Sequence, residues 1–155
     1  MTPFDTRIQI NSPEYEQQRS GMLALVKQLQ ALEQRAIQKS AKSQAAFAKR
    51  GALLPRERLA RLLDPLAPFL PICNLAGYGM DSADLDATIP GGSQVAGIGI
   101  VNGVRCMLIV TDSGINAGAL TEAGNQKLMR CQEIALENKL PFIHLVESSG
   151  SNLRQ

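Results

Sequence analysis

The chain has 155 residues, a mass of 16.7 kDa and a formal net charge of +2. This length suits one domain of ordinary size, and a composition of 45% hydrophobic and 19% charged residues excludes a disordered or fibrous chain. No apolar run approaches the ~20 residues that cross a bilayer, and residues 1–12 lack the apolar core of a signal peptide. We therefore expect a cytoplasmic protein that has no membrane association.

Positive charge is concentrated in residues 35–61, where Glu57 is the one acidic residue. This block favours a phosphate-bearing partner, and nucleotides, CoA, nucleic acid or simply a solvated helix face all remain open. Phe47 is the one aromatic residue in the block, which argues against an RNA-binding surface. The basic residues are Arg35, Lys39, Lys42, Lys49, Arg50, Arg56, Arg58 and Arg61.

The first half of the chain has a helical pattern. Ser12 and Pro13 are typical of a helix start, and apolar residues at three- and four-residue spacing predict an amphipathic packing helix to about Gln38. Residues 39–51 read as a mobile basic connector that ends at a glycine. Pro55 and the leucines that follow it predict a short helix to Leu63.

The second half has the pattern of an α/β fold. We expect a strand over residues 72–76, a polar loop to Asp86, and a hairpin of strands 94–101 and 104–110 around Asn102-Gly103. A helix from Thr121 to Lys139 and a buried strand over residues 142–146 follow. The last loop leads toward a further helix, so we expect the sheet to be incomplete and its exposed edges to favour association.

Two loops follow strands and could present backbone amides to a ligand. Residues 116–120 join a strand to a helix, where small residues let a ligand approach the positive helix end, although a plain turn is an equal alternative. The segment Ser148-Ser149-Gly150 has the same position after the next strand, where amides could stabilise an enolate or carboxyl oxygen.

Other candidate sites are disfavoured. Gly97-x-Gly99 with Gly103 lies within a strand and its turn rather than before a helix, so it is no dinucleotide motif. His144 is expected to be a hydrogen-bonded structural residue, and Ser148 and Ser149 lack the surroundings of a hydrolase nucleophile. Three widely spaced cysteines indicate core thiols and no metal site: Cys73, Cys106 and Cys131.

Several segments, in order along the chain, resemble the N-terminal half of one known family. They are residues 50–64 with the Arg56-Glu57-Arg58 block, Ala76-Gly-Tyr-Gly-Met80, Pro90-Gly-Gly92 and residues 132–141. The family is the carboxyltransferase (beta) subunits of biotin-dependent acyl-CoA carboxylases of methylcrotonyl-, geranyl- and propionyl-CoA type. The resemblance implies an incomplete crotonase-like ββα spiral at residues 66–155, preceded by a helical segment with a basic connector at residues 1–65.

This resemblance also implies a function and partners. An acyl-CoA would accept carboxylate from carboxybiotin, which a biotin-carrying alpha subunit supplies to a homo-oligomer, and this chain alone would be inactive. Ser149 and Gly150 would form a backbone oxyanion hole, although serine departs from the family's usual glycine pair. The predicted CoA-binding residues are Arg50, Arg56, Ala117, Gly118 and Ala119.

Two alternatives remain open at this point. One is a crotonase-like enoyl-CoA hydratase or isomerase, for which Glu122 or Glu147 would supply the acid or base. The other is a non-catalytic fragment that only pairs with another subunit.

Overall fold

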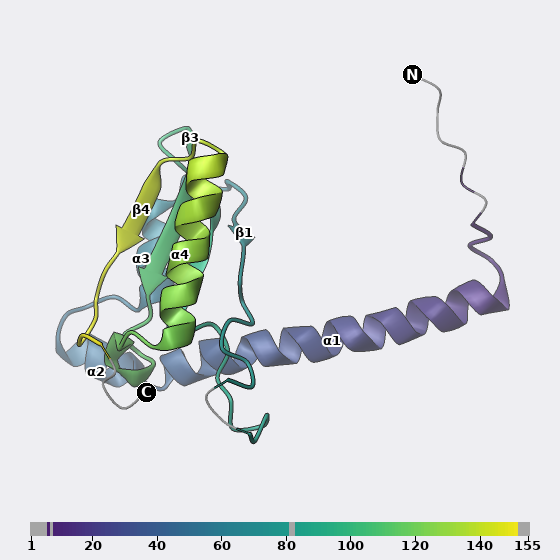
Figure 1. The fold of residues 1–155 in the computed structure, drawn as a ribbon, viewed down its shortest axis with the longest axis horizontal. Coiled ribbons are helices and arrows are strands. Elements are labelled where there is room, and N and C mark those ends of the chain that lie inside the picture. Colours follow the sequence, from purple (N-terminus) through teal and green to yellow (C-terminus); the bar gives the residue numbers. More distant parts are fainter. Residues whose placement is uncertain (1–5, 7, 81–82, 152–155) are drawn as a thin grey trace. The chain divides into compact units, whose positions relative to one another are not determined.

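The computed structural model describes residues 6, 8–80 and 83–151. The chain divides into two compact units, residues 1–31 and 32–155, and the sheet lies in the second (Figure 1). The predicted division at residues 65 and 66 stays a prediction about domain organisation.

Helix α1 (Pro13–Ala41) begins where the sequence predicts, because the Ser12 hydroxyl accepts a hydrogen bond from the Tyr15 amide at 3.1 Å. Its early apolar residues are exposed, however: Met22 by 61%, Leu25 by 59% and Leu29 by 42%. The described residues of the first unit form no other helix or strand that could cover this stripe, so its role as a packing surface stays a prediction.

The predicted mobile connector at residues 39–51 is wrong as well. Residues 39–41 continue α1, and Gln44–Lys49 form a helix, α2, held by Phe47, which is only 2% exposed. Burial of one large aromatic side chain fixes the segment despite its alanine- and lysine-rich sequence. Helix α3 (Pro55–Leu62) follows as predicted, and the Glu57 carboxylate accepts the Leu54 amide at 2.9 Å at its start.

The sheet has four strands in the order β1-β2-β3-β4: Leu70–Pro71, Gln94–Val101, Val104–Thr111 and Phe142–Leu145. Strands β2 and β3 form the predicted hairpin, whose turn residues Asn102 and Gly103 both have positive φ. Helix α4 (Glu122–Glu137) then crosses over to β4, which pairs in parallel with β3. The α/β fold class is thereby confirmed.

The strand predicted at residues 72–76 is wrong, because β1 is the two-residue segment before it. Cys73 adopts a positive φ of 54°, and the Ala76 amide donates to the Cys73 carbonyl at 3.2 Å. The chain therefore turns away from the sheet immediately after Ile72, whose amide still donates to Ala96.

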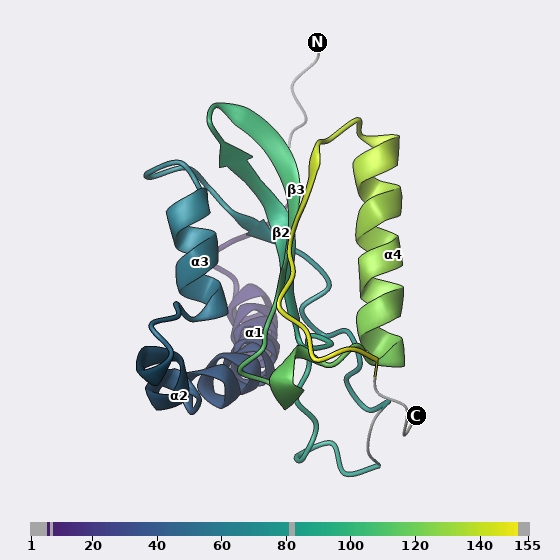
Figure 2. The ribbon, with the colours of Figure 1, turned by 90° about the vertical axis from the view of Figure 1, so that its left-hand side faces the viewer.

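Helices cover both faces of the sheet, with α3 on one side and α4 on the other (Figure 2). Alternation along β3 divides its side chains between two clusters. Cys106, Leu108 and Val110 pack with Leu59 of α3, whereas Met107 and Ile109 pack with Cys131 of α4. Both faces of this central strand are thus buried.

The strand glycines 97 and 99 have a packing role. A Cβ atom at Gly97 would overlap the Phe69 ring, and one at Gly99 would overlap the Leu63 side chain. Glycine therefore lets α3 and the segment after it lie directly on β2. This placement supports the rejection of a dinucleotide motif.

Candidate functional site

The two candidate loops lie side by side at the ends of the parallel strands β3 and β4. A short 3₁₀ helix, η1 (Asn116–Gly118), forms the first loop, and residues 147–151 form the second. The Leu120 amide donates to the Gly150 carbonyl at 2.9 Å, and the Ser149 amide donates to the Ala117 carbonyl at 3.1 Å. The structure thus brings the predicted oxyanion residues and the predicted CoA-side loop into direct contact.

A close backbone approach holds the loops together at Gly118. Its φ is +69°, and a Cβ atom there would overlap the Glu147 carbonyl oxygen and lie 2.9 Å from Thr111 Cγ2. Asn116 and Ala117 also have positive φ, so three successive residues take left-handed conformations. Such conformations in non-glycine residues cost free energy and are common at ligand sites.

The two amides predicted to form the oxyanion hole differ in their hydrogen-bond partners. The Ser149 amide is bonded to the other loop, so it would have to leave Ala117 to meet a ligand. The exposed Gly150 amide donates to a local partner, the Ser148 hydroxyl oxygen at 3.1 Å, which a ligand oxygen could replace. Gly150 has φ +103° and open space around it, so glycine is required there by conformation rather than by packing.

The second loop is anchored to α3 by an ion pair that the sequence analysis missed. Arg58 Nη1 lies 3.1 Å from Glu147 Oε2, and the two side chains are 27% and 33% exposed. Glu147 therefore orients the loop, and its carboxylate already has a cationic partner. The only signal in the sequence was the position of Arg58 off the leucine stripe of its helix.

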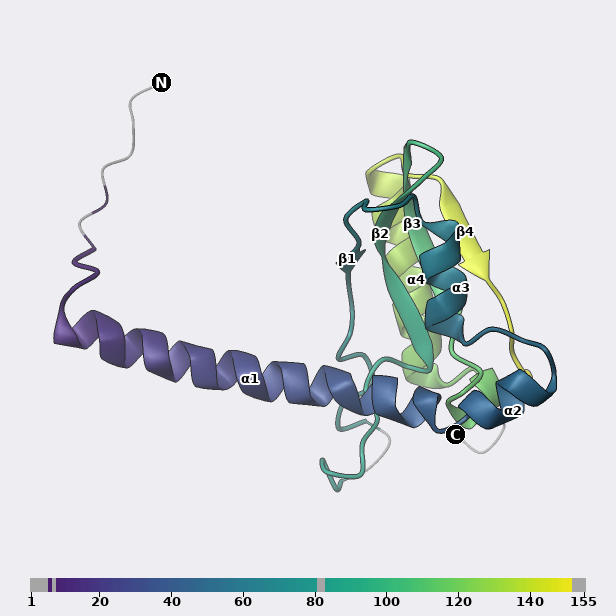
Figure 3. The same cartoon turned by 180° about the vertical axis from the view of Figure 1, so that it is seen from behind.

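The end of α1 and the start of α2, both within the basic block, are hydrogen-bonded to the connection between β3 and η1 (Figure 3). The Ser43 hydroxyl donates to the Gly114 carbonyl at 3.0 Å, and the Ser40 hydroxyl donates to Asp112 Oδ1 at 2.7 Å. A hollow of about 300 Å³ opens beside this connection, and its lining includes Lys39, Asn116 and Thr121. Lys39 is the basic residue of this hollow.

The N-terminus of α4 forms another part of the same surface. Thr121 caps the helix, because its hydroxyl accepts a hydrogen bond from the Gly124 amide at 3.1 Å. A capped helix start carries a partial positive charge, which adds to that of Lys39 and suits an anionic group.

The two arginines predicted to bind CoA phosphates have different surroundings. Arg50 is exposed at the end of α2, with its guanidinium carbon 4.8 Å from the centre of the Phe47 ring. Arg56 instead is half-buried and lines a separate cavity, where burial lowers its pKa from the ordinary value while Asp112 and Glu33 oppose the shift. The structure does not join them in one cluster.

Asp112 lies between the basic segment and the loops and is 1% exposed. Burial raises the pKa of this carboxyl, against the hydrogen bond from Ser40 and the charge of Arg56. Its Oδ1 also accepts the Gly114 amide at 3.2 Å. In the sequence, the one signal for this residue is its position directly after a strand, so it was not predicted.

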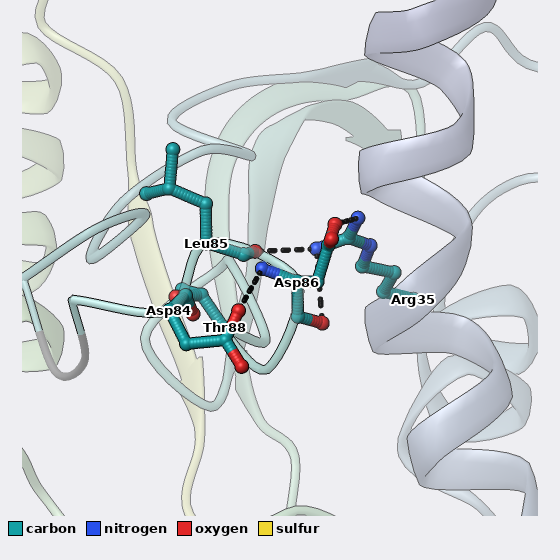
Figure 4. A network of polar contacts seen from close by, with 5 residues as sticks. All are labelled: Arg35, Asp84, Leu85, Asp86 and Thr88. Atoms are coloured by element: carbon teal, nitrogen blue, oxygen red, sulfur yellow. Dashed lines mark hydrogen bonds and ion pairs between the residues drawn. The ribbon is translucent and has the colours of Figure 1, made fainter.

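A further clamp fixes the loop before β2. Arg35 donates to the Leu85 carbonyl at 2.7 Å and to Asp86 Oδ1 at 3.1 Å (Figure 4). The neighbouring turn is closed by Thr88, whose hydroxyl donates to the Asp84 carbonyl at 3.2 Å. One residue of the basic block is thus committed to structure.

His144 and the three cysteines, which the sequence disfavours as functional residues, have surroundings that suit a structural role. His144 Nε2 lies 3.3 Å from the Thr111 hydroxyl, and burial lowers its pKa. All three cysteines are free; Cys106 and Cys131 are buried and Cys73 is half-buried. In the described part of the chain, no cluster of three potential metal ligands occurs, and no helix is long and apolar enough to span a membrane.

Comparison with solved structures defines the class of fold. The chain matches the beta subunit of *P. aeruginosa* geranyl-CoA carboxylase with a TM-score of 0.88 and 43% identity, over 97% of this chain and 28% of that subunit. It matches the transcarboxylase 12S subunit with a TM-score of 0.65 and 25% identity, over 87% of this chain and 26% of that one. The crotonase-like carboxyltransferase fold that the resemblance implies is confirmed.

Sequence comparison then gives the family. Residues 47–155 match the carboxyl transferase domain, and the chain belongs to that family. The mitochondrial methylcrotonoyl-CoA carboxylase beta chain of *Dictyostelium discoideum* is 37% identical over 151 residues, which are 97% of this chain and 25% of that protein. The biotin-dependent 3-methylcrotonyl-coenzyme A carboxylase beta1 subunit of *Mycobacterium tuberculosis* is 43% identical over 104 residues, 67% of this chain and 19% of that subunit. The chain thus spans about a quarter or less of these relatives.

Proposed function

We propose that this chain forms the acyl-CoA-binding N-terminal part of an acyl-CoA carboxylase carboxyltransferase subunit. The observation that carries the proposal is the pair of hydrogen-bonded loops at the ends of β3 and β4, which present backbone groups beside a basic hollow. Enolate chemistry needs charge stabilisation by such donors and no side-chain nucleophile. The relatives named above support the same activity.

In this proposal the Gly150 amide is the oxyanion donor, because it can exchange the Ser148 hydroxyl for a thioester oxygen. Ser149 and Ala117 hold the donor loop in place through their mutual hydrogen bond. Gly118 and Ala119 lie on the same loop and line the path of the acyl-CoA. Carboxybiotin, delivered by a biotin-carrying partner subunit, would supply the carboxyl group.

The phosphates of CoA are assigned to the exposed part of the basic block. Lys39 lines the hollow beside η1, and Arg50 is held at the end of α2 by its contact with Phe47. Arg56, half-buried in the wall of a separate cavity, is better suited to a small anion than to a bulky ribose phosphate. The role of Arg56 toward CoA stays a prediction.

One contact disfavours Glu147 as the acid or base of the hydratase or isomerase alternative. That role needs a carboxylate that can exchange a proton with the substrate, whereas Glu147 is paired with Arg58 at 3.1 Å. This contact does not test Glu122, the other residue named for the role.

We further propose that the subunit is a homo-oligomer. The exposed apolar stripe Met22, Leu25 and Leu29 of α1 supports association, because such stripes are usually covered by another chain.

Calorimetric titration of the chain with CoA and with 3′-dephospho-CoA tests the proposal. We expect micromolar binding of CoA, and binding weaker by about tenfold when the 3′-phosphate is absent, as loss of one charge-assisted contact predicts. Arg50→Glu should weaken CoA binding at least as much. Arg105→Glu makes the same charge change at an exposed position near the hairpin turn and should have no effect. Equal affinity of both variants for CoA would refute the phosphate assignment, and absence of binding to folded protein would refute the proposal.

A further inference from the structure

A second site is a partly open cavity of about 220 Å³ between α3, α4, the start of β2 and the end of α1. The cavity has room for several waters or one small organic molecule. Apolar and polar side chains both line it. The polar residues are Glu33, Gln34, Arg56, Asn74, Gln94 and Lys127.

Gln94 is the clearest sign that the cavity is built for a ligand. The residue is 5% exposed, and in the described part of the chain neither Nε2 nor Oε1 of its buried amide has a hydrogen-bond partner. A buried polar group without a partner destabilises the fold, and folded proteins seldom leave both ends of an amide unsatisfied. This side chain offers two N–H donors and one oxygen acceptor to an occupant.

Two cations line the same cavity. Lys127 is 2% exposed and donates to the carbonyls of Gly91 at 3.2 Å and Gln94 at 2.7 Å, which leaves one of its three N–H donors. Arg56 Nε is buried, and the described residues provide no partner for it. The two charges are close enough to act on each other, since Arg56 contributes to the lowered pKa of Lys127.

The carboxylates nearby do not neutralise these cations by direct contact. Glu33 lines the cavity, but its Oε1 accepts a hydrogen bond from Asn74 at 2.8 Å. Asp112 directs its Oδ1 to Ser40 and the Gly114 amide. Among the described residues, Lys127 forms no ion pair with any carboxylate, although buried charges are normally paired.

We propose that this cavity binds a small anion that combines a carboxylate with a hydroxyl group. The carboxylate accepts hydrogen bonds from Arg56 Nε and from the remaining Lys127 donor. The hydroxyl donates to Gln94 Oε1, and the Gln94 amide nitrogen donates back to the anion. Such a ligand supplies the missing counter-charge and satisfies both ends of the amide. A hydroxycarboxylic acid and bicarbonate share this chemistry.

Ligand titration of the chain, followed by amide chemical shifts and by the midpoint of thermal unfolding, tests the proposal. Glycolate, methoxyacetate and bicarbonate are each compared with chloride at the same ionic strength and neutral pH. We expect saturable stabilisation by glycolate and about tenfold weaker binding of methoxyacetate, which lacks the hydroxyl donor and leaves Gln94 Oε1 unpaired. Bicarbonate that binds more tightly than glycolate would assign the site to the inorganic anion, and the reverse order to an organic acid.

Variants test recognition of the hydroxyl group and recognition of the carboxylate separately. Gln94→Leu should bind glycolate and methoxyacetate with equal affinity, because the hydroxyl acceptor is gone. Lys127→Met should abolish saturable binding of either anion, whereas Lys27→Met, at an exposed position of α1, should leave it unchanged. The comparison of the two anions on the unmodified chain remains decisive if a cavity variant fails to fold. Equal effects of glycolate and chloride would show that the cavity holds water only, and would overturn the proposal.

Discussion

Gly118 offers a direct test of whether the two loops form one structural unit. In Gly118→Ala the new residue would keep a φ of +69°, which costs an L-residue about 1–2 kcal/mol. Its Cβ atom would also overlap the Glu147 carbonyl oxygen and lie 2.9 Å from Thr111 Cγ2. Overpacking of this kind adds about 1–3 kcal/mol, so we expect a total destabilisation of about 3 kcal/mol.

A matched glycine isolates the steric part of this effect. Gly103 has a similar φ of +76°, but nothing lies within 4 Å of a Cβ atom built there. Gly103→Ala should therefore cost only the conformational term of about 1–2 kcal/mol. For a chain of this size, the midpoint of thermal unfolding should fall by roughly 6–12 °C in Gly118→Ala and by roughly 2–8 °C in Gly103→Ala.

Urea unfolding followed by circular dichroism gives the two free energies, and hydrogen exchange locates the damage. Separation of the loops in Gly118→Ala should speed exchange of the Leu120 and Ser149 amides, whose acceptors lie on the opposite loop. Equal destabilisation by the two substitutions, or unchanged protection of those amides, would refute the close approach at Gly118.

Two further predictions concern charged side chains. Arg58→Met should lower the free energy of unfolding by about 1 kcal/mol, since its ion pair with Glu147 is partly exposed. It should also speed amide exchange in residues 147–151. Arg61→Met, at an exposed position on the same helix, should have neither effect. Burial lowers the pKa of Lys127 from 10.5 to about 8, so the unfolded chain binds more protons between these values and stability should rise by about 3 kcal/mol from pH 8 to pH 10.5. Urea midpoints measured across this range should rise in the unmodified chain and not in Lys127→Met, and parallel curves would contradict the burial of the charged amine.

The sheet and its two covering helices could be predicted because their signals are local. Asn102-Gly103 between two apolar runs specifies the hairpin, and the capping Thr121 specifies the start of α4. One failure involves packing between residues distant in the sequence, and the other involves a local turn. Phe47 orders α2 only because tertiary packing buries it, and the positive φ of Cys73 ends the predicted strand at its second residue.

The candidate loops could also be found from the sequence, because both follow strands that pair in parallel and therefore end at the same edge. The hydrogen bonds and the ion pair that these loops form could not be predicted. No residue pattern indicates that the Ser149 amide bonds to Ala117 or that Glu147 pairs with Arg58, since these contacts cross 32 and 89 positions of the chain. The cavity lined by Gln94 and Lys127 could not be predicted either. In the sequence, these two residues look like an ordinary strand residue and an ordinary helix residue.

Fewer basic residues are available to bind phosphates than the sequence of residues 35–61 suggests. Arg35 is hydrogen-bonded to a loop, Arg56 lines the cavity beside β2, and Arg58 is paired with Glu147. Lys39 lines the hollow, and three further basic residues between the end of α1 and the end of α2 are exposed: Lys42, Lys49 and Arg50. The Ser40 and Ser43 hydroxyls fix these two helices to the β3–η1 connection. The block therefore has two roles, because its half-buried arginines hold neighbouring segments in place while its exposed lysines and Arg50 stay available to an anionic ligand.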